Sequence, residues 1–130
     1  MKHAVLSELP IRIALTLGLM LLLAILSLIP GRAESGDSLF VWALAATPTP
    51  LQKLLHLLLY ALLTLLWVWT LAAIDSWIVR VSIAVLLAVG FGAVMEIAQT
   101  RIPGRFGTLT DVLLNGAGAV FGVLLAWLLL

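Results

Sequence analysis

The sequence predicts an all-α integral membrane protein, a single domain over residues 1–130 built as a bundle of four transmembrane helices. Two observations support this class. Of the 130 residues, 64% are hydrophobic and only 10% are charged, whereas a soluble domain of this size needs a larger charged surface because its outside faces water. The apolar residues also gather in four runs, and each is long enough to cross a bilayer at ~20 residues per helix.

The predicted spans cover residues 11–29, 51–73, 78–99 and 111–130. The first run has an alternative interpretation as a secretory signal, with small residues Gly31 and Ala33 before a cleavage point. We favour a retained span, because the run is longer than the ~7–15 residues of a signal core.

A polar, turn-rich segment over residues 30–50 separates the first two spans. Inside it, the apolar stretch 39–44 is too short to cross the bilayer. We expect this stretch to lie at the membrane interface, where the indole of Trp42 is favourable.

Charge and cysteine content exclude several functions. The net charge is +1, so no basic field indicates nucleic-acid binding, and the chain has no cysteine for a disulfide, a thiolate nucleophile or a metal site. No phosphate-binding glycine loop or HExxH motif is present. We predict neither a metal nor an organic cofactor, and membrane lipids as the surrounding partners.

Four crossings place both termini on one side of the membrane and segments 30–50 and 101–110 together on the other. Positive charges do not orient the chain clearly. Lys53, Arg101 and Arg105 weigh against a cytoplasmic amino terminus, but they are candidates for a site and should not count as topology signals. We therefore favour a cytoplasmic amino terminus.

This even number of crossings also brings polar side chains from three helix ends to one membrane boundary. Polar residues inside spans are costly and need a reason. Those at the start of the second span share one helical face, as do those at the end of the third and at the start of the fourth. The candidate site comprises Lys53, His56, Tyr60, Glu96, Gln99, Arg101, Arg105, Asp111 and Asn115.

These residue types suit an anionic ligand. Lys53, Arg101 and Arg105 are cations for a phosphate or carboxylate, and His56 and Glu96 are candidates for general acid and base. Tyr60, Gln99, Asp111 and Asn115 would shape the pocket. A divalent metal on His56, Glu96 and Asp111 is a weaker alternative, because no ligand-spacing motif supports it.

Each residue also has a purely structural interpretation. Lys53 is typical of a snorkelling anchor, Glu96 of an ion pair with one of the three nearby cations, and Asp111 of a cap on the fourth helix. Asn115 suits an interhelical hydrogen bond, and the glycines Gly116, Gly118 and Gly122 suit close helix packing.

The pattern Lys53-x-x-His56-x-x-x-Tyr60, Glu96-x-x-Gln99-x-x-x-Pro103-Gly104-Arg105 and Asp111-x-x-x-Asn115-x-x-Gly118-x-x-x-Gly122 resembles the VanZ-like family over residues 51–122. That family is named for a membrane protein of a glycopeptide-resistance cluster and is associated with reduced sensitivity to teicoplanin. The chain departs from it in two places. Gln52 stands where the family usually has an acidic residue, and a threonine replaces the serine that often precedes the aspartate.

The resemblance implies a small bacterial protein of the inner (cytoplasmic) membrane, linked to the cell envelope or antibiotic resistance. It supplies no mechanism, so three hypotheses remain. The protein binds an anionic lipid or glycolipid headgroup, it is an intramembrane hydrolase or transferase acting on such a headgroup, or it is a structural partner of an envelope complex.

Overall fold

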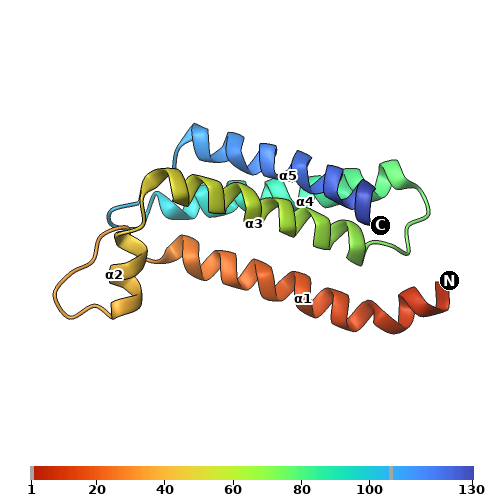
Figure 1. Ribbon diagram of the computed structural model, residues 1–130, viewed down its shortest axis with the longest axis horizontal. Coiled ribbons are helices and arrows are strands. Elements are labelled where there is room, and N and C mark those ends of the chain that lie inside the picture. Colours follow the sequence, from red (N-terminus) through yellow and green to blue (C-terminus); the bar gives the residue numbers. More distant parts are fainter. Residues whose placement is uncertain (1, 106) are drawn as a thin grey trace.

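The computed structural model describes residues 2–105 and 107–130, which form five helices and no strand. The helices are α1 (Lys2–Leu28), α2 (Leu39–Ala45), α3 (Thr49–Thr70), α4 (Trp77–Gln99) and α5 (Leu109–Leu129). Four of them run side by side along the long axis of the molecule, and α2 lies at one end (Figure 1). The prediction of an all-α bundle is confirmed.

The four long helices are each apolar and long enough to cross a membrane, as a multi-pass membrane protein requires. Two boundaries differ from the predicted spans. Helix α1 begins at Lys2 and continues through Pro10, so it starts well before residue 11. Helix α3 ends at Thr70, and Leu71–Ala73 form a turn instead of a last helical segment.

Helices α3 and α4 each pack against the other three long helices, and α3 makes the more extensive contacts. Helix α5 packs most extensively on α3, while α1 contacts α3 and α4 but not α5 within the described residues. In Figure 1, α1 accordingly lies on the far side of α3 from α5. The side of α1 that faces away from α3 is lined by exposed apolar residues, as expected for a lipid-facing surface.

Small residues let α5 approach α3 closely. A Cβ at Gly118 would stand 2.5 Å from the carbonyl oxygen of Leu57, and a Cβ at Gly122 would collide with that of Ala61. The predicted packing role is therefore confirmed for Gly118 and Gly122. It is wrong for Gly116, where an added Cβ would meet none of the described atoms within 4 Å, because this residue lies on another face of the helix.

The apolar stretch in the segment between α1 and α3 forms α2, a helix of seven residues. Ser38 caps it by accepting a hydrogen bond from the backbone N–H of Val41. None of its side chains is buried, and Leu39, Phe40 and Trp42 are exposed. Its position at the membrane interface stays a prediction.

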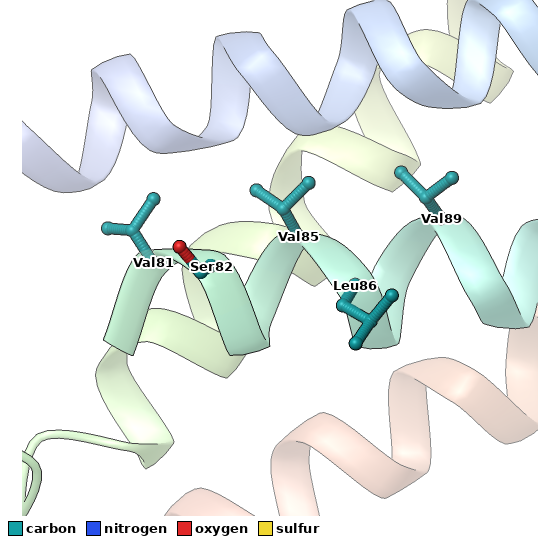
Figure 2. A pocket seen from close by; sticks show the side chains of 5 residues that line it. All are labelled: Val81, Ser82, Val85, Leu86 and Val89. Carbon is teal, nitrogen blue, oxygen red and sulfur yellow. The ribbon is translucent and has the colours of Figure 1, made fainter. Parts of the chain in front are cut away.

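The outer surface of α4 has a shallow apolar depression of about 470 Å³. Figure 2 shows its lining, with Val81, Val85 and Val89 directed toward α5 and Leu86 toward α1. Ser82 is its only polar lining residue among those described, so the depression has no group that could hold a charged ligand. It suits contact with lipid chains and lies away from the predicted polar site.

Candidate functional site

A larger and more polar cavity, of about 550 Å³, lies where α3 begins, α4 ends and α5 begins. We call this end of the bundle, with the segments that follow α1 and α4, the loop end. Six of the nine predicted residues line the cavity: Lys53, His56, Glu96, Gln99, Arg105 and Asp111. The expectation that three helix ends meet at one boundary is confirmed.

Four side chains from three helices form what we call the His56 cluster: His56 and Glu96, which line the cavity, and Tyr60 and Asn115, which do not. The Nε2 atom of His56 hydrogen-bonds to Oδ1 of Asn115 and lies 3.7 Å from Oε1 of Glu96. The rings of His56 and Tyr60 have centroids 4.8 Å apart. His56 thus connects α3 to both α4 and α5.

The hydrogen bond to Asn115 relates the protonation of His56 to the orientation of the Asn115 amide. With Oδ1 of Asn115 toward the ring, as in the structure, the amide oxygen accepts and Nε2–H is the donor. In the neutral ring, Nδ1 is then the nitrogen that can accept a proton. His56 is partly exposed and lines the cavity, which makes it the member of the cluster best placed to meet a ligand.

The His56 cluster contains polar atoms that are buried without a partner. Glu96 is only 5% exposed. Its carboxylate interacts with the backbone N–H of Thr108 at the start of α5, although its Oε2 has no regular side-chain hydrogen bond to a described residue. The same holds for the hydroxyl of Tyr60 and for Nδ2 of Asn115. Buried polar groups are normally satisfied, so burying this set costs free energy that hydrogen bonds within the described residues do not fully offset. Glu96 pairs with His56 and not, within the described residues, with the lysine or arginines that sequence reasoning considered.

Gly92 creates the room for this cluster, and sequence reasoning missed it. A Cβ at Gly92 would collide with Nδ2 of Asn115 and stand 2.8 Å from Cε1 of Tyr60. Gly92 lies four residues before Glu96, one helical turn away on the same face of α4. That spacing from a polar residue inside a span was the available signal.

Arg105 has a structural role that the sequence did not reveal. Its Nε donates to the carbonyl of Ile29 at 2.9 Å and its Nη2 to that of Leu26 at 3.0 Å. A guanidinium here satisfies free carbonyls at the end of α1 and complements its dipole. Burial lowers the pKa of Arg105 from its ordinary value, and nearby Glu96 and Asp111 oppose that shift.

Two glycines allow the turn over residues 101–105 to approach the end of α1. Gly104 has a φ of +74°, a conformation that favours glycine. A Cβ on Gly31 would collide with the carbonyl oxygen of Gly104, and the N–H of Gly31 donates to the carbonyl of Pro103 at 3.4 Å. The predicted turn at Pro103-Gly104 thus directs Arg105 back toward the cavity.

The other predicted cations differ from each other. Lys53 is exposed, lines the cavity and has no ion pair with a described residue. Arg101 is exposed, belongs to the turn after α4 and is not among the residues that line the cavity. The structure therefore does not bring it together with Lys53 and Arg105 in the cavity lining.

The structure at the start of α5 corrects the interpretation of Asp111 as the cap of this helix. Thr108, and not Asp111, is the N-cap, because its Oγ1 accepts from the backbone N–H of Asp111 at 3.2 Å. The hydroxyl of Thr108 also donates to Oδ2 of Asp111 at 2.6 Å. This reciprocal pair resembles a capping box. Asp111 also lines the cavity, but among the described residues no three side chains form a metal-holding group.

The cavity also has an apolar part that sequence reasoning missed. Leu23 and Leu26 of α1 and Leu55 and Leu59 of α3 line it. In α1 these leucines lie further from the loop end than Ser27, and in α3 they lie further from it than Lys53. The lining therefore changes from polar at the loop end to apolar between α1 and α3. A cavity of this kind can accommodate an amphipathic molecule.

A second polar group, also missed, lies at the opposite end of the bundle. We call it the Arg12 cluster: Glu8, Arg12, Thr16, Trp69 and Thr70. Arg12 donates to the carbonyl of Trp69 and to Glu8, both at 2.7 Å, and its guanidinium lies 4.6 Å over the Trp69 ring. The hydroxyls of Thr16 and Thr70 are 2.8 Å apart. The i, i+4 spacing of Glu8, Arg12 and Thr16 was a usable signal.

The fold and the site together define a small multi-pass helical membrane protein with a polar cavity at the loop end of its bundle. The VanZ/LLP1 family model matches residues 14–130, and the chain belongs to that family. The match includes every predicted site residue. Comparisons with curated proteins and with solved structures return no match.

Proposed function

We propose that the protein binds the headgroup of an anionic lipid or glycolipid within one leaflet, in the cavity at the loop end. The observation that carries the proposal is the two-part lining of the cavity. Its mouth is polar, with Lys53 and Arg105, and its interior continues past Leu26 and Leu59. A headgroup would occupy the first part and the start of an acyl or prenyl chain the second.

The charges at the mouth support this assignment. Lys53 is exposed, so its ammonium can reach a phosphate without losing an existing ion pair in the described structure. Arg105 has five N–H donors and uses two on the carbonyls of α1, so three remain for a ligand. Charge-assisted hydrogen bonds from such groups are the stronger kind.

The biological setting follows from the family. We propose that headgroup binding serves the bacterial cell envelope and contributes to glycopeptide (teicoplanin) resistance by masking or remodelling an envelope target. The proposal includes an inner-membrane location with a cytoplasmic amino terminus. Reporter fusions near residues 40 and 105 test the shared compartment of these two segments, and fusions at the amino terminus test the orientation.

Two exposed cations near the cavity give a matched test of binding. Lys53→Ala should weaken binding of phosphatidylglycerol about tenfold, because it removes one charge-assisted hydrogen bond of about 1.5 kcal/mol. Arg101→Ala removes the same charge outside the cavity and should leave the affinity within about twofold. Native mass spectrometry of the purified protein measures both. Equal losses in the two variants would indicate a non-specific charge effect and refute the site.

A specific observation also favours a catalytic function, as a hydrolase or transferase acting on the headgroup. His56 lies at the cavity wall, where its Nε2 hydrogen-bonds to Oδ1 of Asn115 and lies beside Glu96, an arrangement that leaves Nδ1 as the basic nitrogen. Nδ1 would accept a proton from an attacking water or hydroxyl. Turnover of a polyprenyl phosphate or phospholipid that disappears in His56→Ala would establish this function. Binding without turnover would support binding alone.

A further inference from the structure

We infer that the chain of the bound lipid leaves the cavity sideways, between the loop-end parts of α1 and α3, so that the lipid enters from the surrounding leaflet and not from water. This inference rests on the proposed function and adds the route of the chain. The cavity has a volume of about 550 Å³, which is the size of a pocket for a drug-sized ligand. A membrane lipid is larger than such a ligand, so most of its chain has to lie outside the cavity.

The opening for the chain has to be apolar, because hydrocarbon that passed through the polar mouth would be exposed to water. The side of the cavity between α1 and α3 meets this condition. Leu26 of α1 and Leu55 of α3 both line it, and Leu55 is also 45% exposed. Leu23 lines the cavity as well but is only 3% exposed, so the opening lies on the loop-end side of Leu23.

The lining at Leu55 continues into the outer surface of α3. Leu51, Leu54 and Leu58 are exposed, and their spacings of four, one and three residues from Leu55 make them its neighbours on the helix. None of these three residues lines the cavity. Leu55 therefore joins the apolar part of the cavity to a surface that suits contact with lipid chains.

The contacts of α1 explain why a gap can exist here. The hydrogen bonds that join α1 to α3 within the described residues lie at the opposite end of the bundle, in and beside the Arg12 cluster. Apolar packing between the two helices continues as far as Leu23, which shares a core cluster with Tyr60. Closer to the loop end, α1 is held by Arg105 from the turn after α4. This end of α1 is thus fixed without closing against α3.

The other helices of the cavity wall are less suited to the passage of a chain. Helix α5 packs on α3 more extensively than any other two helices pack on each other, and α4 packs against both. The side chains that α4 and the start of α5 contribute to the lining include Glu96, Gln99 and Asp111. A chain that left between these helices would pass polar and charged groups and deprive them of solvation, which is unfavourable.

Helix α2 does not close the gap by packing. Leu44 and Ala45 line the cavity, yet α2 packs against none of the long helices within the described residues. Figure 1 shows α2 near the end of α1 and the start of α3. Its exposed residues Leu39, Phe40 and Trp42 add apolar surface beside the gap, and an indole is favourable at the membrane interface.

Two neighbouring leucines of α3 give a matched test of the route. Leu55→Trp narrows the gap, whereas Leu54→Trp adds the same volume at a residue that is 53% exposed and does not line the cavity. We expect Leu55→Trp to weaken binding of phosphatidylglycerol about tenfold, because the larger side chain displaces the lipid chain. Leu54→Trp should stay within about twofold of the unmodified protein. Native mass spectrometry measures both variants, and equal affinities would overturn the inference.

A photoreactive lipid locates the chain in the unmodified protein. Phosphatidylglycerol with a diazirine on its acyl chain should label the segments around Leu26 and Leu55, as identified by peptide mass spectrometry. At a lipid concentration below the Kd, this labelling should fall about tenfold in Lys53→Ala, because occupancy follows headgroup affinity. Leu86 is 72% exposed on α4 and reports ordinary lipid contact, so its labelling should not change. An equal response at Leu55 and Leu86 would overturn the route.

The outcomes separate this route from the proposed function. A loss of binding in Lys53→Ala, with equal affinities of Leu55→Trp and Leu54→Trp, would retain headgroup binding and remove the route. No binding of phosphatidylglycerol by the unmodified protein would refute both. If Leu55→Trp does not fold, as judged by its melting temperature, the photolabelling decides. An excess of soluble glycerol 3-phosphate should not displace the lipid, because it lacks the chain, and displacement would assign the site to a free phosphate.

Discussion

The two ends of the bundle place polar residues inside apolar helices for different purposes. In the Arg12 cluster the guanidinium bonds to Glu8 and to the carbonyl of Trp69, and it also lies over the Trp69 ring. In the His56 cluster, Glu96 and Asn115 each retain a buried atom without a hydrogen bond in the described structure. The first cluster satisfies most of its own groups, although Nε of Arg12 has no described partner. The second faces a cavity.

The comparison shows how a structural polar cluster can be told from a functional one. Both cost desolvation free energy when they enter an apolar bundle. The Arg12 cluster recovers that cost within the fold, by connecting α1 to the end of α3. The His56 cluster also connects helices, but two of its residues, His56 and Glu96, line a cavity. Neither charge within a span nor an unsatisfied buried atom distinguishes the two clusters, whereas the adjoining cavity does.

The largest expected effect concerns the Arg12 cluster. Arg12→Ala should lower the free energy of unfolding by about 3 kcal/mol, because it breaks two hydrogen bonds of a largely buried charge. Arg80→Ala is the matched control. Arg80 also lies over an indole, that of Trp77, at 4.8 Å, but the contact alone contributes about 0.5–1 kcal/mol.

Thermal unfolding in detergent measures both arginine variants, and lipid binding by the folded fraction of Arg12→Ala should be unchanged. A selective loss of lipid binding in Arg12→Ala, with an unchanged melting temperature, would contradict the structural assignment.

A smaller effect is expected where α5 packs behind the His56 cluster. Gly118→Ala should destabilise the protein by about 2 kcal/mol, because its Cβ would stand 2.5 Å from a backbone oxygen of α3. Gly116→Ala, two residues earlier in the same helix, has open space and should be neutral or slightly stabilising. Melting temperatures give the comparison. Similar destabilisation by both changes would mean that α5 is rotated relative to the structure described.

The smallest effect concerns Arg105, which both hydrogen-bonds to carbonyls at the end of α1 and lines the cavity. Arg105→Lys keeps the charge but cannot donate to two carbonyls in the fixed geometry of a guanidinium. We expect a loss of about 1 kcal/mol in stability and a change of less than threefold in phosphatidylglycerol affinity. Arg105→Ala should reduce both properties. If Arg105→Lys matched the original protein in stability, capping of α1 would not be the role of Arg105.

Much of the site was predictable because helical periodicity is local. The spacing of Lys53, His56 and Tyr60 places them on one face of a helix whatever the helix packs against. An even number of crossings then brings the relevant ends of α3, α4 and α5 to one boundary. These two arguments predicted six of the residues that line the cavity, and they required only the chain itself.

The remaining features depend on which helix faces which. Sequence reasoning placed Arg101 in the pocket with Arg105, but only the turn at Gly104, whose φ is +74°, directs one arginine inward and leaves the other exposed. Gly116 was grouped with Gly118 because both are small. Their difference lies in the rotation of α5 against α3, which a pattern within one helix does not contain.

By itself, the sequence determined the class of the protein, its four apolar helices and the polar character of one end, because hydropathy and periodicity act along the chain. The tertiary structure alone decided that α1 contributes to the apolar part of the cavity and that Arg105 caps the end of α1. It also decided that Gly92 makes room for Asn115 and Tyr60. These contacts join residues far apart in the chain, so they depend on the shapes of packed surfaces.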